Sequence, residues 1–318
     1  MTENRILSVL RKTPKPAFKT IRFFLILMIP VSLGVMLLDE AGILLWVAFF
    51  SAPAMGFLGL PGEASLVLLS SFALGQYSAI AVIQSLNLSI RDIIILATFC
   101  NIAHSFIIEG AIMKKNGSSF SRILLIRLFS AIAASWVLNL ILPQVSVPQE
   151  PAGILPGAIG INLHTMPSII QAWLLSSLFL AVKISLIILA IVFLQKFMEE
   201  FGIINIMAKA MAPLMRVFGL SANAGYVWIV AYVIGLGFGA AALIEEVHSG
   251  RLSLHDADLF NHHVAISHSQ LEDTLLFVAI GAPLLWVALP RFFIAIIVVW
   301  LTKWQRAFFR RSFSVKVG

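Results

Sequence analysis

Two sets of polar side chains that could bind ions or move protons recur in this chain at matched spacings. In each set a His-Ser pair follows an aspartate by twelve residues, and an acidic residue comes five residues after the histidine. The first set is Asp92, His104, Ser105 and Glu109, and the second is Asp256, His268, Ser269 and Asp273. Imidazole and carboxylate groups bind divalent cations, and they also exchange protons near neutral pH. The two sets therefore indicate an ion-binding or proton-transferring site.

The polar sets belong to a longer internal repeat. The first copy also contains Gly59, Leu60, Ala64, Gly75, Ala81, Leu88, Ser89 and Gly117, and the second contains Gly219, Leu220, Ala224, Gly235, Ala241, Leu252, Ser253 and Gly281. One constant offset in numbering relates the copies as far as Ala81 and Ala241, and a slightly larger one relates them from Leu88 and Leu252 onward. One short insertion therefore aligns the copies. In an apolar chain, this pattern predicts a duplicated membrane unit with polar residues where the halves meet.

The composition is that of a protein embedded in lipid. Hydrophobic residues make up 60% and charged residues 12%, whereas a soluble domain has about 25% charged residues. The net charge of +7 is concentrated near the two ends, and basic residues that flank apolar spans usually face the cytoplasm. We therefore expect an inner-membrane protein with both termini in the cytoplasm and no nucleic-acid partner. The single cysteine, Cys100, excludes an internal disulfide and a multi-cysteine metal site.

The apolar segments predict an all-α polytopic fold. A membrane span needs about 20 mostly apolar residues, and the candidates are 20–38, 41–58, 63–84, 90–113, 121–142, 169–196, 203–218, 223–246, 254–280 and 283–303. These ten segments form two five-segment repeats, 20–142 and 169–303, and the odd number inverts the second relative to the first. The remaining regions are a basic cytoplasmic N-terminus (1–19), an extracytoplasmic linker (143–168) and a basic cytoplasmic tail (304–318).

Glycine-rich segments 63–84 and 223–246 leave two structures open, full crossings or broken and re-entrant helices. Re-entrant hairpins would move the basic loop of Lys114, Lys115 and Arg122 to the outside of a ten-segment scheme, against the charge rule. We therefore expect full crossings.

Candidate pathway residues come from the fourth and ninth segments. They are Asn101, His104, Ser105 and Glu109 in the fourth, and Asn261, His262, His268, Ser269, Glu272 and Asp273 in the ninth. On a continuous helix, most of the second group would share one polar sector, and His268 and Glu272, four residues apart, could bind a divalent metal. Three interpretations stay open: hydrogen bonding between helices, a divalent-metal path, and proton coupling.

The paired Gly-Leu-x-x-x-Ala starts, the glycine-rich segments and the repeated Leu-Ser-x-x-Asp and His-Ser elements resemble the nucleoside recognition, or Gate, domain family. That family includes the spore maturation proteins A and B and the membrane part of the large ferrous-iron permease. The resemblance implies two related helical halves and a transport-like pathway, without implying nucleosides as the solute. The iron permease also has a GTPase domain, but this sequence has no G-x-x-x-x-G-K-[S/T] phosphate loop.

These observations predict a transporter or permease for a small solute or ion, rather than an enzyme. The alternative is a non-transporting membrane subunit or scaffold that acts with a partner. The expected partners are the lipid bilayer, the solute, and a second copy of this chain or another Gate protein. The sequence leaves the cofactor unknown, with a divalent metal as the one candidate considered.

Overall fold

The computed structural model describes residues 2–143, 160–161 and 163–314, and in these residues every regular element is a helix. Five stretches are long and apolar enough to cross a membrane: Asn4–Glu40, Ile90–Lys115, Phe120–Ile141, Met166–Glu200 and Leu284–Phe308. The protein is therefore an all-α polytopic membrane protein, as the sequence predicted. Most of the predicted 143–168 linker lies outside the described residues.

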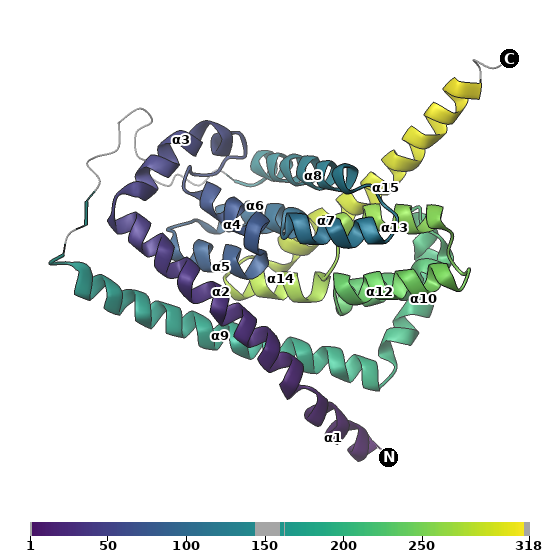
Figure 1. Ribbon diagram of the computed structural model, residues 1–318, viewed down its shortest axis with the longest axis horizontal. Helices are drawn as coiled ribbons and strands as arrows, with labels where there is room; N and C mark the ends of the chain where they lie inside the picture. The colour runs from purple at the N-terminus through teal and green to yellow at the C-terminus, as the bar shows by residue number, and fades with distance from the viewer. Residues whose placement is uncertain (1, 144–159, 162, 315–318) are drawn as a thin grey trace.

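From α2 and α9 onward, the α-helices of the two halves follow the same order, whereas α1 belongs to the first half alone and the short η1 to the second. The first half contains α1 (Thr2–Lys12), α2 (Pro14–Glu40), α3 (Ile43–Phe57), α4 (Ala64–Leu74), α5 (Gln76–Ser85), α6 (Ile90–Ala103), α7 (Phe106–Lys115) and α8 (Phe120–Ile141). The second contains α9 (Met166–Glu200), α10 (Ile203–Val217), the short η1 (Ala222–Ala224), α11 (Gly225–Val233), α12 (Leu236–His248), α13 (Leu254–Ile266), α14 (Gln270–Ala279) and α15 (Leu284–Ser314). Figure 1 shows α9 and α8 along opposite edges, with the shorter helices between them.

Segments 63–84 and 223–246 are helical hairpins and not the continuous helices that a full crossing, expected from the sequence, would need. In the first, α4 and α5 pack side by side and the chain reverses at Gly75, whose φ of 96° favours glycine. In the second, the reversal is at Gly235, and Asn223 at one end donates a 3.0 Å hydrogen bond to the Arg251 carbonyl at the other. Each arm has at most 13 residues, or about 20 Å of helix, which is too short for a bilayer core of about 30 Å.

Segments 90–113 and 254–280 are helices that are interrupted at their His-Ser pairs. The first breaks between α6 and α7, where His104 is extended and Ser105 is left-handed, with a φ of 44°. The second breaks between α13 and α14, where Ser269 has a φ of 46°. Ser105 and Ser269 are the non-glycine residues with positive φ among those described. The polar sector calculated for a continuous helix over 254–280 therefore does not exist.

Each hairpin tip is hydrogen-bonded to the interruption in its own half. The Ser105 N–H donates to the Ser71 carbonyl at 3.0 Å, and the Ser269 N–H donates to the Ala231 carbonyl at 2.9 Å. The repeat alignment places Ser71 opposite Ala231 and Ser105 opposite Ser269, so the two hydrogen bonds are equivalent. The hairpins and the interrupted spans therefore form a repeated unit that meets near the middle of the molecule.

Two glycines in α12, Gly237 and Gly239, provide a test of the hairpin packing. A Cβ added at Gly239 would lie 2.6 Å from the Ala231 Cβ in the facing arm α11, whereas one at Gly237 would meet nothing within 4 Å. We expect Gly239→Ala to lower the free energy of unfolding by about 1–3 kcal/mol through overpacking. Gly237→Ala should raise it by up to about 1 kcal/mol, because alanine favours helix. Thermal unfolding of both variants in detergent measures the difference, and equal effects would contradict the packing of α11 against α12.

Candidate functional site

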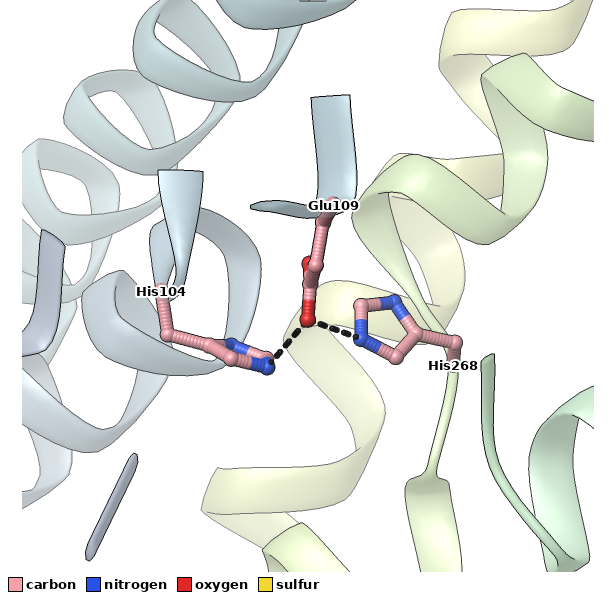
Figure 2. Close-up of side chains that lie close together, drawn as sticks. All are labelled: His104, Glu109 and His268. Carbon is pink, nitrogen blue, oxygen red and sulfur yellow. Dashed lines mark hydrogen bonds and ion pairs between the residues drawn. The ribbon is translucent and has the colours of Figure 1, made fainter. Parts of the chain in front are cut away.

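Three buried side chains from the two interruptions meet at the centre of the protein. Nε2 of His104 lies 2.9 Å and Nε2 of His268 lies 3.1 Å from the same oxygen, Oε1 of Glu109 (Figure 2). The exposed fractions of His104, Glu109 and His268 are 5%, 7% and 1%. Because His104 and Glu109 belong to the first half and His268 to the second, the cluster exists only when both halves are in contact.

The helix interruptions orient both imidazole rings. Nδ1 of His268 lies 2.7 Å from the Val264 carbonyl, and Nδ1 of His104 lies 2.9 Å from the Cys100 carbonyl, in each case four residues earlier. A carbonyl oxygen only accepts hydrogen bonds, so Nδ1 of His268 carries the hydrogen in this contact. In the neutral ring, Nε2 then presents a lone pair to the Glu109 carboxylate. A proton or a metal ion at this position removes the repulsion between the two acceptors.

The second oxygen of Glu109 is paired with a buried arginine on α8. Nη2 of Arg127 lies 2.6 Å from Oε2, while its Nε and Nη2 donate to the Ile102 and His104 carbonyls at 2.8 and 2.7 Å. These carbonyls end α6, where the helix dipole favours a cation. Arg127 therefore compensates the buried carboxylate and also caps the interrupted helix.

The second half contains the equivalent ion pair, and neither arginine was among the predicted site residues. Nη1 of Arg291 on α15 lies 3.1 Å from Oδ2 of Asp273, and its Nη2 donates to Thr274. The numbering offset that aligns Glu109 with Asp273 also aligns Arg127 with Arg291. Extending the repeat alignment beyond Gly117 and Gly281 would have revealed them.

The other predicted pathway residues have different surroundings. Asn101 accepts a hydrogen bond from Gln76 beside His104, whereas Ser105 and Ser269 hold the hairpin tips. The side chain of Asn261 donates to the loop that follows α7. His262 contacts the Asp258 carbonyl within α13. The hydrogen bonds of these two residues are therefore separate from the cluster of His104, Glu109 and His268.

The structure does not bring the predicted metal pair, His268 and Glu272, together on one helix. The helix breaks between His268 and α14, so their spacing of four residues no longer places them on one face. Glu272 accepts a hydrogen bond from the hydroxyl of Tyr77 on α5, which is a second contact between the halves. His268 instead faces Glu109.

The cluster has the donors for two kinds of chemistry. One ligand atom from each of His104, Glu109 and His268 lies within 4.8 Å of the others, which suits a divalent metal ion. The same arrangement can pass a proton between the two rings through the carboxylate. Both activities use buried ionisable groups, which are costly inside a membrane without a compensating partner.

Hairpins, interrupted spans and a central ionisable cluster define this chain as a multi-pass α-helical membrane protein. It is similar to a Bacillus subtilis (strain 168) protein described as "Uncharacterized membrane protein YvoD". The two are 27% identical over 254 residues, which cover 80% of this chain and 81% of that protein. No model of a known protein family matches the chain, and no solved structure matches it.

The ion pair of Glu109 and Arg127 can be tested with a double-mutant cycle. Arg127→Gln leaves a buried carboxylate without its arginine, so we expect the free energy of unfolding to fall by about 3–5 kcal/mol. Adding Glu109→Gln should recover part of this loss, because it removes the unpaired charge. The exposed pair of Lys196 and Glu199 on α9 is the control and should show weak coupling. Strictly additive losses at Glu109 and Arg127 would argue against the buried pair.

Proposed function

We propose that this protein is an inner-membrane transporter that moves a small solute or ion along a path between its two halves. The main support is the meeting of two helical hairpins and two interrupted spans around ionisable residues from both halves. Irregular backbone is tolerated at membrane depth only where it is buried in protein or lines a cavity. Secondary transporters commonly bind their substrates near the bilayer midplane, between inverted repeats of this kind.

The direction of the half-helices supports a binding role for the centre. Helices α5 and α12 begin at the hairpin tips, at Gly75 and Gly235, and α7 and α14 begin at Ser105 and Ser269. The partial positive charges of four N-termini therefore converge near the cluster, together with Arg127 and Arg291. Glu109, Glu272 and Asp273 lie in the first turns of α7 and α14 and balance this charge.

The arrangement of the hairpins supports alternating access. Helices α3 and α10, which precede the two hairpins, lie at opposite ends of the molecule (Figure 1). Each hairpin thus reaches the centre from its own end, and its tip is held there by one backbone hydrogen bond to an interrupted span. Displacing one hairpin would open the buried cluster to one side, while the other hairpin keeps the opposite side closed.

A six-crossing topology reconciles the hairpins with the charge rule. Five crossings are the long apolar stretches that contain α2, α6 with α7, α8, α9 and α15. The sixth is the more polar α13 with α14, which the repeat aligns with α6 and α7. Three crossings per half still invert the second repeat, because a hairpin adds no net crossing. Both termini and the loop of Lys114, Lys115 and Arg122 then face the cytoplasm. The motifs shared with the Gate family support membership in it as part of the same proposal.

Transport can be measured with purified protein in liposomes on a solid-supported membrane. Divalent cations, nucleosides and small carboxylates are tested separately, and at least one class should produce a transport current. His104→Gln should abolish that current, whereas His255→Gln, an exposed substitution on α13, should preserve it. A complete lack of current from folded wild-type protein would instead favour the partner-dependent membrane subunit.

Cysteine labelling can test the topology. Cys100 is the chain's one cysteine and is buried, so Cys100→Ala provides a background for single cysteines. We expect Lys115→Cys and Gly250→Cys to react from the cytoplasm, and Gly160→Cys to react from the opposite side. The Gly160 N–H donates to the Ala41 carbonyl between α2 and α3, which associates these two segments. Labelling of Lys115→Cys and Gly160→Cys from the same side would contradict the six-crossing scheme.

A further inference from the structure

We infer that His104, Glu109 and His268 form a binding site for a divalent transition-metal ion. This inference rests on the proposed transport function, because it identifies the transported solute as that class of ion.

The donor set selects the class of ion. Two imidazole nitrogens and one carboxylate oxygen suit zinc, iron, cobalt, nickel or manganese, whereas magnesium and calcium prefer shells made of oxygen ligands. With metal–ligand bonds of about 2.0–2.2 Å, the donors of a tetrahedral site lie roughly 3.3–3.6 Å apart. The two distances to Oε1, 2.9 and 3.1 Å, are within a few tenths of an ångström of that spacing. Small side-chain movements would therefore admit the ion.

The surroundings hold each donor in the orientation that a metal requires. Metal-binding histidines usually use their second ring nitrogen to donate to a carbonyl or carboxylate. In this cluster both Nδ1 atoms contact carbonyl oxygens, of Cys100 and Val264, which leaves both Nε2 atoms directed at the centre. Arg127 is paired with Oε2 of Glu109, so Oε1 remains directed at the two rings.

A metal ion explains the convergence on Oε1 better than protons do. With protons, the convergence needs two different ring states. A neutral His104 donates from Nε2 while its Nδ1 accepts from Nε2 of Gln76 at 3.1 Å, whereas His268 must become an imidazolium to donate from Nε2. A divalent ion is coordinated by all three donors at once. The geometry thus favours one shared cation.

The position of the site connects binding with movement of the halves. His104 and Glu109 come from one interrupted span and His268 from the other, so a bound ion joins the halves in the occluded arrangement. Release requires the contact between His268 and the first half to break. Because binding to the folded protein adds to its stability, the ion should also raise the unfolding temperature.

The test is a titration of chelator-treated, full-length protein in detergent with Co²⁺, followed by calorimetry and visible absorption. We expect one Co²⁺ per chain, d–d bands typical of low-symmetry nitrogen and oxygen coordination, and no displacement by Mg²⁺ or Ca²⁺. His268→Gln should weaken Co²⁺ binding by more than about 100-fold, beyond the loss typical of an outer-sphere change. Glu109→Gln is an independent ligand variant and should weaken binding similarly.

Matched controls separate this site from its alternatives. His255→Gln should leave Co²⁺ affinity unchanged, because His255 is exposed at the start of α13. Absence of Co²⁺ binding to wild-type protein, or unchanged binding in both His268→Gln and Glu109→Gln, would overturn the assignment. Co²⁺ binding at these residues without Co²⁺ flux in liposomes would uphold the site and overturn the proposed transport.

Discussion

Interrupting a helix inside a bilayer removes hydrogen-bond partners from backbone groups that lipid cannot satisfy, and this constraint shapes the whole structure. At each interruption a serine N–H is bonded to a carbonyl in the nearby hairpin. In the first half, Arg127 also donates to two carbonyls at the end of α6. The hairpins therefore have a structural role before any functional one, since they complete the backbone of the interrupted spans.

The same interruptions also bring the ionisable side chains of the centre together. A continuous helix would use the carbonyl and amide groups near His104 and His268 internally, and it would place Asp273 and Glu109 by helical periodicity alone. The extended and left-handed residues of the breaks instead turn both imidazoles toward one carboxylate. The second carboxylate, Asp273, is paired with Arg291, so the two halves are alike in architecture but unequal in the groups they contribute. Glu109 becomes the shared acid of the cluster.

Composition and spacing were sufficient to predict the helical membrane fold and the repeat, and they placed the three residues of the cluster among ten candidates without singling them out. The sequence did not predict the hairpins. An apolar segment that is long enough for one membrane crossing and has a glycine at its centre can also form two half-length helices that reverse at the glycine. The predicted metal pair, His268 and Glu272, assumed a continuous helix between the two residues. The structure instead has a break there, at the left-handed Ser269. Arg127 and Arg291 lay within apolar segments and were overlooked, although the repeat alignment relates them.

In the proposed topology, each half-length hairpin reaches the middle of the membrane and returns to the side from which it entered. Labelling with a membrane-impermeant thiol reagent at Glu63→Cys and Asn87→Cys, in the Cys100→Ala background, tests this most directly, because these residues flank the arms α4 and α5. We expect both positions to react from the same side of the membrane, opposite to Lys115→Cys. Reaction of Glu63→Cys and Asn87→Cys from opposite sides would show that the segment crosses the membrane fully and would exclude the six-crossing topology.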